Sequence, residues 1–410
     1  MKEAPFVFKF DFGLEELPEE PGIILVRGPR QYGKSTWLEQ QILATIDRHG
    51  PGSAFLINGD EIRDDAGLTR TIRDLLPLFA MGSRVRRLFI DEVTAVPGWQ
   101  KALKVLADSG ELRRVLVVTT GSKASDIRRA SERLPGRKGK LERTTYLFTP
   151  ISYGEFKRVC GPVLAGRTLD AYLLSGGSPV ACAELAASRR IPQYVIELTR
   201  DWILGEFAAS GRSRASLLAV LECLHRFAGT PVGQAKLARE AGLANNTVAA
   251  GYVELLTDLA CVAPIFAWDP SRRIPNHRRP SKYPMINLLA AISWHPSRPR
   301  SLDDHDRLSP EGQGRLLEWL VAQELWRWAA IRGAEVPEML LYWMGDEHEI
   351  DFVLGPDEFL EVKRGGATAL DFAWFPRSFP GGRLTVIGSS RFETDRIRGI
   401  TAEDFLLTGP

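Results

Sequence analysis

The chain has 410 residues, of which 44% are hydrophobic and 25% are charged, and its formal net charge at pH 7 is +2. A chain of this length holds two or three domains, and its hydrophobic content is ample for buried cores. The near-neutral charge excludes a protein that is basic throughout, so any nucleic-acid surface must come from local clusters of basic residues.

Cysteine usage and hydropathy favour a cytoplasmic protein. No apolar run approaches the roughly 18 residues of a membrane span, and the first residues lack the core of a signal peptide, so we expect no membrane contact. The six histidines have no metal-ligand spacing and are expected to be structural or exposed. The cysteines have no paired spacing either, which indicates reduced thiols and no zinc site; they are Cys160, Cys182, Cys223 and Cys261.

The first motif in the chain is a complete G-x-x-x-x-G-K-[ST] phosphate-binding loop. An apolar run precedes it and a helix-like stretch follows, which is the context that this motif needs; the alternative is a glycine turn that carries Lys-Ser by chance. Lys34 would reach the β- and γ-phosphates of ATP, and the Ser35 hydroxyl would bind Mg²⁺. We expect the whole loop to contact the nucleotide: Gly28, Pro29, Arg30, Gln31, Tyr32, Gly33, Lys34, Ser35 and Thr36.

A short buried strand at 87–92 ends in two carboxylates. Asp91 would hold the Mg²⁺ shell and Glu92 would orient the attacking water, as phosphoryl transfer requires. A third apolar strand, at 114–122, ends in hydroxyl residues, and Thr120 or Ser122 is expected to touch the γ-phosphate or the water. A simple turn is the equal alternative there.

Composition changes along the chain divide it into four segments. Apolar strands alternate with helical patterns up to about residue 150, which predicts a parallel sheet flanked by helices, and the remainder begins with helices and ends in strands. The expected fold class is α/β, with α/β domains at the N-terminal and C-terminal ends and helices between them. The segments are an ATPase domain at 1–150, a helical lid or linker at 151–225, a winged helix-turn-helix at 226–300 and an α/β domain at 301–410.

The winged helix rests on two helical patterns, 234–241 and 245–256, with Asn245 as the expected cap of the second. Residues 261–266 would be the first strand of a wing. The basic residues that follow favour contact with DNA phosphates, while a packing block between domains remains the alternative. These residues are Arg272, Arg273, His277, Arg278, Arg279 and Lys282.

A hairpin near the C-terminus carries a second group of charged residues. Its turn, 355–358, places Asp351 opposite Glu361, and strand alternation puts Lys363 on the same face. Two carboxylates and an ammonium can bind Mg²⁺ and position water against a phosphodiester, and Glu318 would complete the set. The alternative is a cross-strand salt bridge in a fold without this activity.

Together these motifs resemble a prokaryotic AAA+-type ATPase family with a C-terminal restriction-endonuclease-like domain of unknown function. The resemblance implies that Asp351, Glu361 and Lys363 form a D-x(n)-E-x-K site, and that Arg137 is an arginine finger acting on a neighbouring subunit. Thr94 stands where the family has Gln. The matching stretches are 28–36, 91–99, 120–122, 134–137, 149–156, 176–179, 314–318, 349–352 and 361–363.

Arg137 lies in a basic loop, and its charge has three interpretations: an arginine finger, a DNA-phosphate contact or a solvated surface. The leading hypothesis is an ATP-hydrolysing, homo-oligomeric protein, with a ring as one arrangement, that remodels, translocates or branch-migrates DNA. A metal-dependent nuclease tail is an addition to it. The rival hypothesis is a nucleotide-dependent switch that binds protein partners and has an inactive tail.

Overall fold

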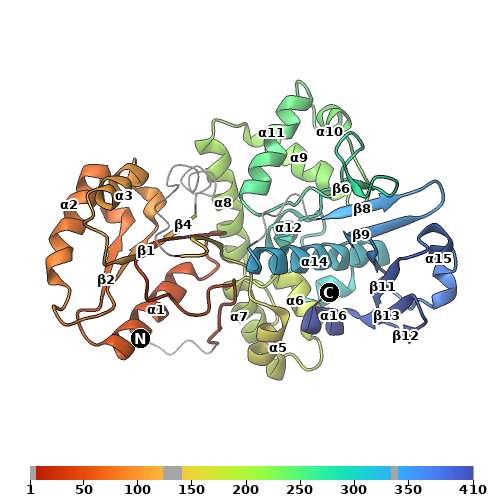
Figure 1. The fold of residues 1–410 in the computed structure, drawn as a ribbon. Helices are drawn as coiled ribbons and strands as arrows, with labels where there is room; N and C mark the ends of the chain where they lie inside the picture. Colours follow the sequence, from red (N-terminus) through yellow and green to blue (C-terminus); the bar gives the residue numbers. More distant parts are fainter. Residues whose placement is uncertain (1–5, 123–140, 334–339, 410) are drawn as a thin grey trace. The chain divides into compact units, whose positions relative to one another are not determined.

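The computed structural model describes residues 6–122, 141–333 and 340–409. The chain forms two compact units, one of residues Phe10–Thr149 and one of Met1–Lys9 with Pro150–Pro410 (Figure 1). Each unit has its own sheet. No helix in the described part of the chain is long and apolar enough to cross a bilayer.

The N-terminal unit is built on a five-stranded sheet in the order β2-β3-β4-β1-β5. Every pairing in it is parallel, as the alternating pattern predicted. Its strands are β1 Gly22–Arg27, β2 Ala54–Asn58, β3 Arg87–Asp91, β4 Leu116–Gly121 and β5 Thr145–Leu147. Its helices are α1 Lys34–His49, α2 Asp65–Leu75 and α3 Trp99–Asp108, with short 3-10 turns at Gly59–Glu61, Leu76–Leu78 and Val93–Ala95.

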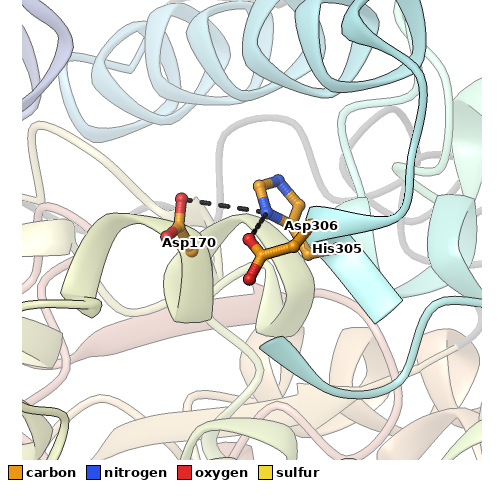
Figure 2. A group of neighbouring side chains, drawn as sticks. All are labelled: Asp170, His305 and Asp306. Carbon is orange, nitrogen blue, oxygen red and sulfur yellow. Dashed lines mark ion pairs between the residues drawn. The ribbon is translucent and has the colours of Figure 1, made fainter. Parts of the chain in front are cut away.

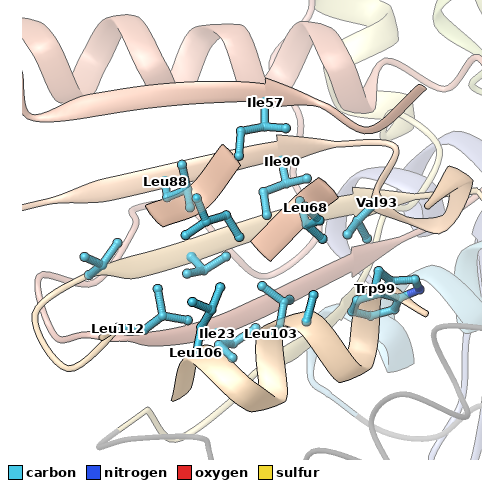
Figure 3. Close-up of a cluster of buried hydrophobic side chains, with 14 of the residues drawn as sticks. Ile23, Ile57, Leu68, Leu88, Ile90, Val93, Trp99, Leu103, Leu106 and Leu112 are labelled. Atoms are coloured by element: carbon cyan, nitrogen blue, oxygen red, sulfur yellow. The ribbon is translucent and has the colours of Figure 1, made fainter. Parts of the chain in front are cut away.

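Alternation along the strands gives this sheet a core on each face. Ile23 and Leu25 of β1 point into a cluster with α2 and α3 (Figure 3), and Ile24 and Val26 point into a second cluster with α1. Strands that are buried on both faces read as continuous apolar runs, which is why 23–26 and 115–118 carry no polar residue. The parallel arrangement brings the carboxyl ends of β1, β3 and β4 to one edge.

The second unit begins with helices. Among them α14 has 22 residues; Ser309 caps it, and Trp319 and Trp326 lie buried in the core. The helices are α5 Tyr153–Cys160, α6 Thr168–Ser175, α7 Pro179–Ser188, α8 Gln193–Ala209, α9 Arg214–Arg226, α10 Gln234–Glu240, α11 Asn246–Asp258, α12 Leu288–Trp294, α13 Leu302–Asp306 and α14 Pro310–Ile331, with a 3-10 turn at Gly161–Val163.

An eight-stranded mixed sheet completes this unit, in the order β12-β13-β11-β10-β9-β8-β6-β7. Its strands are β6 Phe266–Asp269, β7 Ile274–Asn276, β8 Leu341–Met344, β9 Glu349–Gly355, β10 Glu358–Val362, β11 Arg383–Gly388, β12 Phe392–Glu393 and β13 Ile397–Thr401. Short helices follow β10 and β13: a 3-10 helix Ala369–Phe372, α15 Phe375–Ser378 and α16 Ala402–Thr408.

The middle segment has its two helices where the pattern predicted them, at α10 and α11. The Asn245 side chain accepts a hydrogen bond from the Val248 amide at 2.9 Å, so it caps α11 as expected. The expected wing strand leads into β6, which pairs with β7 and, in parallel, with β8. The large sheet therefore contains strands from both sides of residue 300, and the predicted domain boundary there remains a prediction.

Candidate functional site

The phosphate-binding loop connects β1 to α1, and its two glycines allow close packing. Gly33 has a φ of +96°, and a Cβ there would lie 2.5 Å from the Phe10 ring. At Gly28 a Cβ would lie 2.7 Å from both the Cβ and the carbonyl oxygen of Phe148. Any larger residue at either position would displace the loop from its neighbours.

Lys34, the first residue of α1, is buried, and its Nζ donates to the carbonyl oxygens of Gly28 at 3.0 Å and Pro29 at 2.8 Å. Burial lowers the pKa of Lys34 to about 8, against the opposing effect of the Glu92 and Asp91 charges. The Lys34 ammonium therefore packs against the backbone of the phosphate-binding loop, near the Asp91 and Glu92 carboxylates.

Asp91 ends β3 at the same edge of the sheet. Its Oδ1 accepts hydrogen bonds from the Thr120 hydroxyl and from the Glu92 amide, the latter at 3.1 Å. The Glu92 amide also donates to the Thr120 hydroxyl oxygen at 3.0 Å. Thr120 at the end of β4 thus contacts the acidic pair directly, which fixes where the Asp91 carboxylate points.

Glu92 has a left-handed backbone, with a φ of 46°, which is uncommon for a residue other than glycine. Its Oε1 accepts three hydrogen bonds: from the Thr94 hydroxyl at 2.6 Å, the Ser122 hydroxyl at 2.8 Å and the Ser122 amide at 3.0 Å. From the sequence, Ser122 was expected at the phosphate or the water and Thr94 was noted only as standing where the family has Gln, so its bond to Glu92 was not predicted. A hydroxyl two residues after an acid outside a helix gives no periodic signal that would have revealed it.

The other loop residues differ in burial. Arg30, Gln31, Ser35 and Thr36 are exposed, whereas Tyr32 is buried against the core. Ser35 lies in the first turn of the 16-residue helix α1, whose N-terminus carries partial positive charge. Arg137, the expected finger, lies outside the described residues.

The C-terminal hairpin brings Asp351, Glu361 and Lys363 together. The Asp351 amide donates to Glu361 Oε2 at 3.2 Å, and the Val362 amide donates to Asp351 Oδ2 at 3.0 Å. Lys363 Nζ donates to Glu361 Oε1 at 2.6 Å. The predicted group of side chains therefore forms at this hairpin, with Asp351 on β9, Glu361 on β10 and Lys363 directly after β10.

Lys282 enters the same group from the middle segment. Its Nζ lies 3.0 Å from Asp351, 3.7 Å from Glu318 and 3.9 Å from Glu349, and its side chain is 2% exposed. The expectation that Lys282 belongs to an exposed phosphate-binding segment is therefore wrong. The remaining basic residues of that segment, Arg272, Arg273, His277, Arg278 and Arg279, are exposed.

The carboxylates of this group are balanced by two lysines of the same group, Lys282 and Lys363. Burial, together with the Asp351 charge, raises the pKa of Glu318 to about 7 and that of Glu361 to about 8. Burial would lower the pKa of Lys282, but the charges of Asp351, Glu318 and Glu349 outweigh it and keep the ammonium charged. Of these carboxylates, all within the described residues, no three offer ligand atoms within 4.8 Å of one another. This geometry favours a salt-bridge network over a ready metal centre.

Comparisons with known proteins agree with the N-terminal geometry. Residues 20–157 match the family model described as an AAA domain. This segment is therefore an AAA-family domain, with the parallel five-stranded sheet and phosphate-binding loop of a P-loop ATPase. The curated proteins include no match to the chain.

Among solved structures, the chain is similar to a Walker-type ATPase of Pyrococcus abyssi, with 15% identity, coverage of 69% of this chain and 92% of that one, and a TM-score of 0.41. It is similar to the ORC1 protein of Aeropyrum pernix in complex with DNA, with 14% identity, coverage of 68% and 88%, and a TM-score of 0.35. For a RuvB variant of Thermotoga maritima the identity is 15%, the coverage 63% and 85%, and the TM-score 0.33. These scores are too low to carry a functional inference.

Proposed function

We propose that the protein hydrolyses ATP with Mg²⁺ at the edge of the N-terminal sheet and couples hydrolysis to work on DNA. The ATPase part rests on one observation: three segments meet at one edge of the sheet. They are the glycine loop with Lys34 after β1, the Asp91–Glu92 pair at the end of β3, and Thr120 and Ser122 at the end of β4, which hydrogen-bond to that pair. The match to an AAA domain supports ATP hydrolysis.

The chain's own residues divide the task. Lys34 exchanges its bonds to the Gly28 and Pro29 carbonyls for bonds to phosphate oxygens. The Ser35 hydroxyl and the Asp91 carboxylate are hard oxygen ligands of the kind that Mg²⁺ prefers, and the bound ion would neutralise charge on the phosphates. Glu92 orients the attacking water, which requires its Oε1 to exchange at least one of its three donors for that water.

The DNA part of the proposal rests on exposed charge and helix geometry. Asn246 and Thr247 are exposed in the first turn of α11, where a recognition helix presents side chains to bases. The exposed arginines of residues 272–279 supply phosphate contacts, so binding should weaken steeply with salt. Arg137 as a finger requires a neighbouring subunit, and we therefore include a homo-oligomer in the proposal.

The test is steady-state ATP hydrolysis with and without single-stranded, duplex and branched DNA. Strong stimulation by one form, lost in Lys34→Ala, would support a DNA-dependent ATPase and identify its substrate. A slow rate that no DNA changes, but which Lys34→Ala abolishes, would contradict the DNA part and leave the ATPase part intact.

A second candidate function is a nucleotide-dependent switch that binds protein and has an inactive tail. The observation that favours it is the internal neutralisation of Asp351 by Lys282 and of Glu361 by Lys363. A cutting tail would instead show Mg²⁺-dependent nicking that Asp351→Ala and Lys363→Ala abolish while ATPase activity persists. Absence of nicking in the wild-type protein, together with an ATPase rate that no DNA changes, would favour the switch.

A further inference from the structure

Asp170, His305 and Asp306 form a separate cluster in the second unit (Figure 2). Asp170 comes from α6, and the other two come from α13. His305 Nδ1 lies 3.8 Å from Asp170 Oδ1 and 3.9 Å from Asp306 Oδ1. One nitrogen and two carboxylate oxygens, drawn from segments 135 residues apart, thus converge on one point.

His305 is buried, with 6% of its side chain exposed, and neither ring nitrogen has a hydrogen-bond partner. An imidazole buried in this way loses its hydration without a compensating hydrogen bond, which is unfavourable unless another group binds its nitrogens. A neutral ring with a lone pair on Nδ1 is the form that binds metal ions.

The distances in the cluster fit a metal ion better than a hydrogen bond. A nitrogen–oxygen hydrogen bond spans about 2.7–3.2 Å, which is shorter than either separation here. Around a tetrahedral Zn²⁺ with bonds of roughly 2.0–2.1 Å, neighbouring ligand atoms lie about 3.4 Å apart. All three candidate ligand atoms lie within 4.8 Å of one another, so small side-chain movements would complete the site.

Arg167 holds the two carboxylates in place from outside. Its Nε donates to Asp170 Oδ2 at 2.6 Å, and its Nη2 and Nη1 donate to Asp306 at 2.6 and 3.2 Å. Oδ1 of Asp170 therefore remains directed at His305, and Asp306 keeps a lone pair for a second partner. Hydrogen bonds of this kind orient metal ligands in established sites.

We propose that Asp170, His305 and Asp306 bind a divalent transition-metal ion of the zinc class, which fastens α13 to α6. Imidazole and carboxylate together suit Zn²⁺ or Co²⁺. The Ser301–Asp304 capping box fixes the start of α13, so the backbone that carries His305 is already ordered. Three protein ligands leave one position of a tetrahedral ion open to solvent, on the side of the exposed Asp306.

The experiment titrates the metal-free, full-length protein with Co²⁺ and Zn²⁺ in the presence of millimolar Mg²⁺, which keeps the ATP site from contributing. We expect one Co²⁺ per chain with the visible spectrum of a tetrahedral ion, displaced by Zn²⁺, and a raised melting temperature. His305→Gln and Asp170→Asn should each weaken binding at least about 10-fold, because each removes one of three ligands.

His225→Gln is the matched control, because His225 is also buried with an unpartnered Nε2 but faces Trp319 and His295 instead of carboxylates. It should bind Co²⁺ like the wild-type protein. Circular dichroism establishes that each variant is folded, and Asp306→Asn replaces any that is not. Failure of the folded wild-type protein to bind, or equal binding by folded His305→Gln, would overturn the proposal.

Discussion

Single residues decide how the nucleotide site responds to its surroundings. Lys34 has its ammonium buried against backbone carbonyls, and the nearest opposite charges are those of Glu92 and Asp91. A cation in that position retains its proton less firmly than one in water. The lowered pKa of Lys34 is therefore a property of the site that can be measured through nucleotide binding.

We predict that ATP affinity falls with pH above about 8. The free protein loses the Lys34 proton as pH rises through its pKa of about 8, whereas phosphate binding needs the ammonium. The dissociation constant should be constant below this pKa and then rise by up to about tenfold per pH unit. Fluorescent-nucleotide titration measures it. Lys34→Met should bind weakly with no pH dependence; a flat profile in the wild-type protein up to about pH 9.5 would contradict the assignment.

At Glu92 we predict that Thr94→Val raises the basal ATPase rate several-fold. The change preserves shape and removes one of the three donors to Oε1, so the carboxylate is released to the water more easily. A hydrogen bond to a charged group makes a net contribution of about 1.5–3 kcal/mol. The measurement is kcat with KM unchanged, and Glu92→Gln should be inactive in both backgrounds. A lowered kcat would mean that the Thr94 bond positions Glu92 for catalysis.

At the scale of elements, the junction of β1, the loop and β5 leaves no room at Gly28. We predict that Gly28→Ala destabilises the N-terminal unit by about 1–3 kcal/mol and weakens ATP binding, since its Cβ would overlap the Phe148 backbone. Gly82→Ala is the control, because a Cβ there meets nothing within 4 Å. Urea denaturation gives the free energy of unfolding of each variant, and equal values for the two variants would contradict the packing argument.

The hairpin β9–β10 depends on the buried charge of Lys282. We predict that Lys282→Met costs about 3–5 kcal/mol at neutral pH, since it leaves Asp351 and Glu318 unpaired in the interior. The native variant then binds more protons than the unfolded chain, so its stability rises as pH falls below the raised pKa of Glu318, about 7 in the wild-type protein. Lys363→Met, whose side chain is 47% exposed, should cost far less. Denaturation at several pH values measures the stability of both variants. An equal loss of stability in Lys282→Met and Lys363→Met would contradict the role of the buried Lys282 charge.

At the scale of the whole molecule, the two units should respond differently to nucleotide. Saturating ATP with Mg²⁺ stabilises only the unit that binds it, by about 2.7 kcal/mol at a hundredfold excess over the dissociation constant. We expect hydrogen-exchange protection to increase within Phe10–Thr149, with the largest change around residues 28–36. Lys34→Ala provides the baseline. Protection confined to residues 150–410 would place the nucleotide elsewhere.

The sequence predicted what is local in the chain. The loop at 28–36, the strands that flank it and the Asp351–Glu361 pairing follow from periodicity and turn spacing, because each lies within a few residues of its partners. The burial of Lys282 could not be predicted, since it lies in a basic run that is otherwise exposed and meets Asp351 only in the folded sheet. His305 and Asp170 are 135 residues apart, and nothing in the spacing of either indicates the other.

The parallel pairing of β6 with β8 also constrains how the protein is made. Phe266 lies opposite Leu341, so β6 leaves the ribosome well before β8, the strand with which it pairs. The N-terminal sheet waits in the same way, because Gly22 of β1 lies opposite Leu116 of β4 and Leu25 lies opposite Thr145 of β5. The large sheet must wait for its distant partners, and such late pairing is slow and leaves strand edges open. Between the synthesis of residue 276 and that of residue 341, β6 therefore has an unpaired edge at which the nascent chain can aggregate.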